Sequence, residues 1–285
     1  MSGKWVAGSI ASLAMVFAVY AGEIPVKNGE TIAFVGDSIT KFGDRPDGFI
    51  HLVMDGLKQS GVNAKMIPAG IGGNKSDDIL KRLPEILDHK TEWMVLQCGT
   101  NDVGHGENGV SLEDYKKNMT AILDAAQRAG VKVMLVTPSM HTERAESDNN
   151  RKMEGYCEFL RKQANERKLL LVDWNNAERE AIKKRGHIKG LKVTLDNLHL
   201  NGYGNRFLAE AILAGFGVPE AKIVDMKKEW NKIPSMTPIL NAWYDPQYKI
   251  SIDDYEVLYR LADAQNMSVD EFVKKLISNC IERSK

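Results

Sequence analysis

The sequence predicts an α/β protein in which a five-stranded parallel sheet is covered by helices on both faces, followed by a small C-terminal helical appendage. Two observations carry this prediction. Between Thr31 and Val218, short apolar runs of strand length alternate with longer amphipathic stretches of helix length. After Val218 the pattern changes, because residues 221–247 contain three prolines and precede two further amphipathic segments. Strands joined by helical crossovers are parallel, and a parallel sheet is buried on both faces.

Each predicted element has its own sequence signal. The strand-like runs are Ile32–Val35, Ala64–Ile67, Trp93–Cys98, Val131–Thr137 and Leu169–Val172. The helical stretches are Phe49–Gln59, Asp77–Leu87, Leu112–Ala129, Arg151–Arg167, Asn175–Lys184 and Gly202–Ala214. Ser111 and Asp114 resemble a capping box before the third helix, and Gly130 is a suitable stop after it. We expect an irregular connector over 219–247 and a helical hairpin over 248–285, where Ser268 and Glu271 form a second capping box.

The N-terminus carries the pattern of an export signal. Residues 5–22 contain no charged side chain, Lys4 precedes them, and small residues allow cleavage after Ala21. We predict a signal peptide over 1–21 and therefore a periplasmic or extracellular protein with no membrane span after cleavage. An uncleaved anchor is the alternative. No cysteine follows the apolar run, so we expect no lipid attachment.

Charge and cysteine usage exclude several classes of function. The 285 residues have a formal net charge of +0, which argues against binding a polyanion. The hairpin loosely resembles a ribbon-helix-helix module, but its six Lys or Arg and seven Asp or Glu give a charge of −1, so we expect no nucleic-acid partner. We expect it to pack on the domain or to mediate a homodimer. Cys98, Cys157 and Cys280 are odd in number and far apart, which predicts neither a disulfide framework nor a metal pair.

The chemistry is organised around the end of the first strand. The apolar run Ile32–Val35 leads directly into Gly36, Asp37 and Ser38. A hydroxyl at this place stands at the carboxyl edge of the sheet, where open α/β folds bind their ligands. Asp37 is interpreted as a structural residue whose carboxylate accepts local backbone N–H bonds.

Other strand ends supply the groups that a nucleophilic serine needs, which are a base and donors for an oxyanion. The glycine-rich loop 69–76 follows the second strand and can present backbone N–H groups. Asn101 follows the third strand with a side-chain amide. Asp196 and His199 lie near the end of the domain, and their spacing of three puts a carboxylate and an imidazole on the same face of a helical turn.

These four blocks, in this order, resemble the SGNH (GDSL-type) hydrolase superfamily over about residues 31–214. The resemblance implies a flavodoxin-like three-layer α/β/α sandwich, with an SGNH hydrolase domain over 22–218. It also implies ester hydrolysis by two-step acyl transfer without a metal or other cofactor. One departure is visible, because Pro68 stands where the family often has an asparagine before the glycine-rich loop.

The resemblance also assigns roles to individual residues. Ser38 corresponds to the nucleophile, and Asp196 and His199 correspond to its partners. The backbone N–H groups of Ser38 and Gly73, with the side chain of Asn101, correspond to the oxyanion hole.

The substrate is a further expectation. The loop 139–150 follows the fourth strand and is rich in polar residues, namely His141, Glu143, Arg144, Glu146 and Asp148. Polar rim loops suit a hydrophilic substrate better than a long acyl chain. Together with export, they favour a small-molecule or carbohydrate substrate carrying short-chain (acetyl) esters. The alternatives are a lysophospholipase or thioesterase-type acylhydrolase and, in another class, a non-catalytic carbohydrate-binding protein on a hydrolase scaffold.

Overall fold

The computed structural model describes residues 23–185, 192–233 and 252–283 and contains one parallel sheet of five strands. The strand order is β2-β1-β3-β4-β5. The strands are β1 (Thr31–Gly36), β2 (Lys65–Gly70), β3 (Trp93–Gln97), β4 (Lys132–Val136) and β5 (Leu170–Val172). The three-layer α/β/α architecture predicted from the sequence is confirmed. The predicted signal peptide, 1–21, lies outside the described residues.

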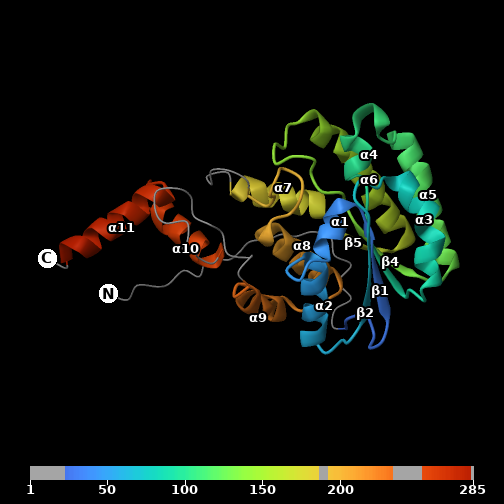
Figure 1. Cartoon of the computed structure of the whole chain (residues 1–285), viewed down its shortest axis with the longest axis horizontal. Coiled ribbons are helices and arrows are strands. Elements are labelled where there is room, and N and C mark those ends of the chain that lie inside the picture. The colour runs from blue at the N-terminus through green and yellow to red at the C-terminus, as the bar shows by residue number, and fades with distance from the viewer. Residues whose placement is uncertain (1–22, 186–191, 234–251, 284–285) are drawn as a thin grey trace.

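Helices cover both faces of the sheet, as Figure 1 shows. One layer comprises α2 (Phe49–Gln59), α7 (Trp174–Lys184), α8 (Gly202–Gly215) and α9 (Glu220–Trp230). The opposite layer comprises α3 (Ser76–Asp88), α5 (Leu112–Arg128) and α6 (Asp148–Arg167). Short helices follow two strand ends, namely α1 (Ser38–Gly43) and α4 (Thr100–Gly104), and a 3₁₀ turn, η1, spans Gly106–Asn108.

The alternation of side chains along each strand divides the core into two clusters. In β1, Ile32 and Phe34 pack in the cluster under α2 and α8, whereas Ala33 and Val35 pack in the cluster under α3 and α5. Successive side chains of a strand point to opposite faces, so a strand buried on both faces consists of consecutive apolar residues. Cys98, directly after β3, is buried in the second cluster.

The topology defines where a site can form. From β1 the chain proceeds to β2 on one side and then crosses back to β3 on the other side of β1. This reversal makes a switch point between the carboxyl ends of β1 and β3, which is where open α/β sheets bind ligands. The residues that follow β1 and β3 therefore lie at this switch point.

One predicted segment is wrong in part. We expected an irregular connector over 219–247, but its first part is the helix α9. Pro219 occupies the N-cap, and the helix buries Ile223, Met226 and Trp230 in the cluster with α2 and α8. These three residues are spaced so that they lie on one face of a helix. Burial of this apolar face stabilises the helix, although the local sequence favours helix only weakly. The three prolines on which the prediction depended lie outside the described residues.

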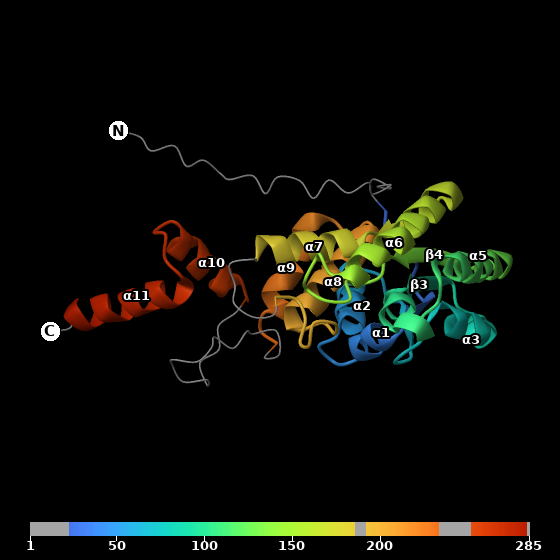
Figure 2. The same ribbon diagram turned by 90° about the horizontal axis from the view of Figure 1, so that it is seen from above.

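The C-terminal hairpin consists of α10 (Ile252–Asp263) and α11 (Val269–Arg283). It lies to one side of the α/β domain in both views (Figures 1 and 2). Ala262 and Phe272 are its buried apolar residues. Two ion pairs join α10 to the domain, Glu256 with Arg185 and Asp253 with Arg206. Among the described residues, no helix has the length and apolar character needed to cross a bilayer.

Candidate active site

Ser38 is placed by a sharp turn between β1 and α1. Gly36 ends the strand, and a Cβ atom at this position would lie 2.1 Å from Thr40 Oγ1 and 2.8 Å from the carbonyl oxygen of Gln97, so only glycine fits. Asp37 is the N-cap of α1, and its carboxylate accepts a hydrogen bond from the backbone N–H of Ile39 at 2.8 Å. This is the structural contact that the sequence predicts for Asp37. Burial raises the pKa of Asp37 to about 6.

The structure brings the three predicted groups into one chain of contacts. Nε2 of His199 lies 2.9 Å from Oγ of Ser38, and Nδ1 of His199 lies 2.7 Å from Oδ2 of Asp196. The other carboxylate oxygen, Oδ1, accepts the backbone N–H groups of Leu198 at 3.0 Å and His199 at 2.8 Å. An imidazole held in this way donates Nδ1–H to the carboxylate and offers Nε2 to the serine proton.

The local structure around this pair differs from the expectation. The spacing of three was interpreted as a helical turn, but residues 194–200 form a tight turn closed by an antiparallel bridge between Thr194 and Leu200. Asn197 occupies the turn with φ of 76°. Asparagine tolerates this left-handed conformation better than most residues. The three-residue spacing brings the two side chains together because the turn folds back, not because a helix aligns them.

The carboxyl group of Asp196 is held in its charged form. Burial raises the pKa of Asp196, but hydrogen bonds from the side chain and backbone of His199 and from Leu198 outweigh it, so the pKa is lowered. The His199 ring packs against the Phe42 ring in an edge-to-face arrangement, with ring centroids 4.8 Å apart. Phe42 in turn lies under the guanidinium of Arg45 at 4.5 Å. The sequence did not predict this packing, because α1 is too short to show a periodic pattern.

The glycine-rich loop forms a turn beside Ser38. The backbone N–H of Asn74 donates to the carbonyl of Ile71 at 3.2 Å, and Gly73 occupies the third position of this turn with φ of 79°. A positive φ at this position is typical of a type II turn and favours glycine. The N–H of Ile71 donates to the carbonyl of Gly36 at 3.1 Å, which joins the loop to the end of β1. The Cβ of Ser38 lies 3.9 Å from where a Cβ of Gly72 would stand.

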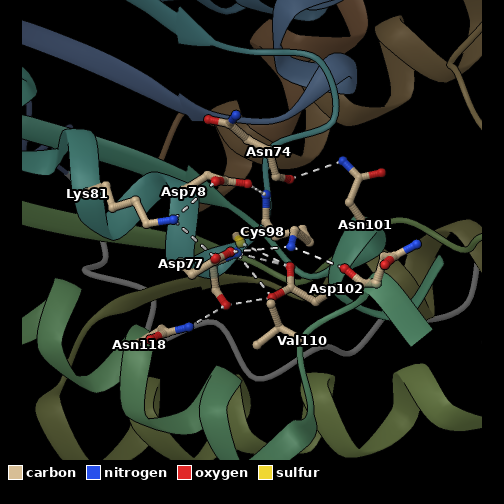
Figure 3. A network of polar contacts seen from close by, with 12 residues as sticks. Asn74, Asp77, Asp78, Lys81, Cys98, Asn101, Asp102, Val110 and Asn118 are labelled. Atoms are coloured by element: carbon tan, nitrogen blue, oxygen red, sulfur yellow. Dashed lines mark hydrogen bonds and ion pairs between the residues drawn. The ribbon is translucent and has the colours of Figure 1, made fainter. Parts of the chain in front are cut away.

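Asn101 reaches the same turn from the end of β3. Its Nδ2 donates to the backbone carbonyl of Asn74 at 3.0 Å, a contact drawn in Figure 3. Asn101 is buried in α4, the short helix that follows β3. A primary amide has two N–H donors, so the contact with Asn74 orients the group and leaves its second N–H for another acceptor.

A buried network supports this side of the site (Figure 3). The carboxylate of Asp102 accepts hydrogen bonds from the backbone N–H of Ser76 at 3.1 Å and from its hydroxyl at 2.5 Å. Asn118 donates to the same hydroxyl at 3.0 Å, and the thiol of Cys98 donates to Asp102 at 3.7 Å. Burial raises the pKa of Asp102 above its ordinary value, and the hydrogen bonds from Ser76 offset only part of this rise. The network joins α4 to the start of α3, which follows the glycine-rich loop.

One residue of the polar loop after β4, Glu143, has a role that the sequence did not predict. Glu143, interpreted as part of a rim for a hydrophilic substrate, instead binds the segment before the Asp196 turn. Its Oε1 accepts the backbone N–H groups of Val193 at 2.8 Å and Thr194 at 2.9 Å and the Thr194 hydroxyl at 2.8 Å. Its Oε2 accepts the N–H of Lys192 at 2.7 Å. Glu143 is therefore a residue of the site that the sequence did not identify as such.

One histidine of this loop, His141, interacts electrostatically with a second histidine, His105, which follows α4. His141 follows β4, and burial lowers its pKa, with a further contribution from His105. Nδ1 of His141 lies 3.2 Å from Nδ2 of Asn149. Within the part of the chain that the structure describes, no three or more His, Cys, Asp or Glu side chains are grouped in a way that would hold a metal ion.

Comparison with known proteins places this arrangement. The sequence profile of the GDSL-like lipase/acylhydrolase family matches residues 34–207, which contain all of the contacts described around Ser38. The chain belongs to this family. It is therefore a carboxylic ester hydrolase of the SGNH (GDSL-type) superfamily.

Individual relatives agree with the family. An acetylxylan esterase of Geobacillus stearothermophilus is 25% identical over 214 residues, which are 67% of this chain and 96% of that protein. Esterase TesA of Pseudomonas aeruginosa is 31% identical over 110 residues, which are 38% of this chain and 53% of that protein. The crystal structure of the acetyl xylan esterase AlAXEase is 30% identical, with a TM-score of 0.61, and covers 65% of this chain and 98% of its own.

Proposed function

We propose that this GDSL-family hydrolase removes acetyl groups from acetylated carbohydrate, with Ser38 as nucleophile and His199 as general base. The observation that carries the assignment is the pair of contacts on one imidazole, 2.9 Å to the Ser38 hydroxyl and 2.7 Å to Asp196. This is the geometry that nucleophilic catalysis by serine requires. The relatives named acetylxylan esterase support the substrate class.

The relative from Geobacillus stearothermophilus supports the residue assignment. Catalytic mutants of that enzyme carry alanine in place of one serine, one aspartate and one histidine. The aspartate and the histidine are three positions apart in its sequence, which is the spacing of Asp196 and His199 here.

The proposed reaction has two steps. Nε2 of His199 takes the proton of Ser38 as Oγ attacks the acetyl carbonyl carbon. The carbonyl oxygen becomes an oxyanion held by the backbone N–H groups of Ser38 and Gly73 and by the side chain of Asn101. The imidazolium then gives the proton to the sugar oxygen as its bond to the acetyl carbon breaks, so the sugar leaves with a free hydroxyl and an acetyl-serine remains. Water, deprotonated by the same imidazole, then attacks the acetyl carbon, and acetate leaves as Oγ regains its proton.

A matched pair of substrates and one variant test this proposal. Purified protein is assayed with p-nitrophenyl acetate and with acetylated xylo-oligosaccharide, and Ser38→Ala is compared with the wild type. We expect turnover of both substrates by the wild type and a loss of about 10⁴-fold or more in the variant. Undiminished turnover by Ser38→Ala would overturn the assignment of the nucleophile.

The second candidate is a lysophospholipase or thioesterase-type acylhydrolase, a class that agrees with the lipase/acylhydrolase description of the matching family. Acetyl, butyryl and octanoyl esters of p-nitrophenol separate the two candidates. A deacetylase loses kcat/KM with each longer chain, whereas a long-chain acylhydrolase gains it, because each buried methylene contributes about 0.8 kcal/mol. A maximum at octanoyl would replace the deacetylase proposal by the second one.

We also propose that the protein is exported after cleavage behind Ala21, on the basis of the uncharged stretch 5–22 behind Lys4. Mass spectrometry of the protein from a bacterial host tests this. A mature chain beginning at Gly22 in the periplasm or medium is expected. A full-length chain retained in the cell would contradict it.

A homodimer through the C-terminal hairpin is a further proposal. It is supported by the large apolar side chains that α10 and α11 expose, which are Val257, Leu261, Leu276, Ile277 and Ile281. Exposed apolar patches mark interaction sites. Light scattering of the wild type and of Leu261→Glu tests it, with a dimer and a monomer as the expected masses. A wild-type monomer at high protein concentration would disprove it.

A further inference from the structure

Arg82, on α3, contacts three segments that carry the candidate active site. Its Nη2 donates to the carbonyl oxygen of Gly36 at 3.0 Å and to that of Ala69 at 2.8 Å. Its Nε donates to the side-chain oxygen of Asn74 at 2.8 Å. One planar guanidinium therefore joins the end of β1, the end of β2 and the glycine-rich turn.

Each acceptor is close in sequence to a proposed oxyanion donor. Gly36 stands two residues before Ser38, and Asn74 directly follows Gly73. The backbone carbonyl of Asn74 accepts the side-chain amide of Asn101, so the third proposed donor is tied to the same residue. The three donors follow three different strands. Arg82 contacts the segments that carry Ser38 and Gly73 directly, and it is linked to Asn101 through Asn74.

The environment of Arg82 is unusual for a charged side chain. Burial lowers its pKa, and the carboxylates of Glu85 and Asp78 offset this only in part. Within the described residues, no carboxylate forms an ion pair with Arg82, and its three hydrogen-bond acceptors are neutral oxygens. By contrast, the neighbouring Lys81 is exposed on the same helix and pairs with Asp77 and Asp78.

We propose that Arg82 is a positioning residue that sets the spacing between the backbone N–H groups of Ser38 and Gly73. This inference rests on the proposed function. The guanidinium presents its donors in a rigid fork, so it holds several acceptors at defined separations, which a lysine ammonium does not. Oxyanion donors act through geometry that is fixed before the reaction. A donor displaced from this geometry therefore stabilises the transition state less.

The test compares Arg82→Lys, Arg82→Gln and the matched control Lys81→Gln. Lys81 is the adjacent cation on α3, and exposed ion pairs contribute little to stability. For each protein, kcat and KM are measured with p-nitrophenyl acetate. Active sites are counted by the p-nitrophenolate released when diethyl p-nitrophenyl phosphate phosphorylates Ser38 to completion. Expressing kcat per titrated site separates a slower site from a smaller folded fraction.

We expect both Arg82 variants to lose about 10-fold to 100-fold in kcat per titrated site, with KM nearly unchanged. The midpoint of the pH–rate profile should stay in place, because Arg82 does not contact His199 or Asp196. The control should match the wild type. Where Arg82→Gln does not fold, Arg82→Lys decides the matter.

Three results would count against the inference. A wild-type kcat per titrated site in Arg82→Gln would show that the spacing does not depend on Arg82. Full activity in Arg82→Lys would show that charge suffices and the fork is not needed. A shifted pH midpoint would place the effect at His199 instead. These results differ from failure of the proposed function, which would appear as activity in Ser38→Ala.

Discussion

The two halves of the site are built in different ways. The half with Ser38, Gly73 and Asn101 grows from the carboxyl ends of three adjacent strands, and buried groups such as Asp102 hold its loops. The half with Asp196 and His199 lies on a turn that no strand of the sheet enters. The Asp196 side chain is 54% exposed, and that of His199 is 21% exposed.

This difference indicates how each half keeps its geometry. Burial and sheet packing restrain the nucleophile side, whereas polar contacts from a distant loop restrain the acid–base side, above all those of Glu143. A partly exposed hydrogen bond contributes less to stability than burial of an apolar group does. It can also be removed by replacing one side chain. The acid–base half should therefore depend chiefly on one anchoring side chain, Glu143, whereas the nucleophile half depends on burial together with the contacts of Arg82.

The largest effect should come from the residues that exchange the proton. We expect Ser38→Ala and His199→Ala each to lower kcat by about 10⁴-fold or more, and the double variant to be no worse than either single one. The physical reason is that an alcohol without its base and a base without its alcohol are equally inactive. Steady-state kinetics with p-nitrophenyl acetate measures this. Additive losses in the double variant would contradict a shared step.

Replacement of the carboxylate should be milder. In Asp196→Asn, the side-chain oxygen still accepts the backbone N–H groups, but the amide faces Nδ1 of His199 with a donor. We expect a loss about 100-fold smaller than that in His199→Ala, because orientation is partly kept. The same assay checks it. If Asp196→Asn were as damaging as His199→Ala, the carboxylate would have a larger role than orientation.

The anchor of the acid–base turn comes next. Glu143→Ala leaves backbone donors of residues 192–194 without their acceptor, so we expect a loss of about 10-fold in kcat and about 2 kcal/mol in the free energy of unfolding. Glu143→Gln, which keeps an acceptor oxygen, should recover part of both. Kinetics and urea unfolding measure these changes.

Glu146→Gln is the matched control, because Glu146 is exposed on the same loop. It should behave as the wild type in both measurements. An unchanged kcat in Glu143→Ala would show that the acid–base turn keeps its geometry without this contact, and the contrast between the two halves would then disappear.

The smallest effect is a pH dependence of stability beside this loop. Glu178 on α7 is fully buried and accepts the backbone N–H of Met140 at 2.8 Å. Burial and, to a smaller extent, the nearby carboxylate of Glu143 raise its pKa to about 8. The folded protein therefore keeps a proton that the unfolded chain releases near its ordinary pKa of 4.5. Stability from this group is present at low pH and is lost as the pH rises toward 8.

Glu178→Gln isolates this contribution. The variant cannot ionise at this position, so its free energy of unfolding should fall less than that of the wild type between pH 5 and pH 8. Asp37 also has a raised pKa, but it is present in both proteins and cancels in the difference. Urea unfolding at the two pH values measures it. Parallel pH dependences in the two proteins would show that the pKa of Glu178 is not raised in the folded protein.

Local sequence signals accounted for much of the fold. Consecutive apolar residues of β1 and β3 predicted strands buried on both faces, because a strand in such a place needs no polar alternation. Glycine and polar residues directly after these runs marked the strand ends at Ser38 and Asn101. The spacing of Asp196 and His199 was also visible, although the turn that joins them was not.

The remaining features depend on contacts between distant residues. Arg82 is 46 residues from Gly36, and Glu143 is 51 residues from Thr194. No periodicity or local motif relates such pairs, because each contact exists only after helices dock on the sheet and bring the donors within 3 Å or so of the acceptors. The helix α9 likewise forms where its apolar stripe finds the core. Local sequence motifs specified the reacting groups, and the packing of helices on the sheet specified how those groups are held in place.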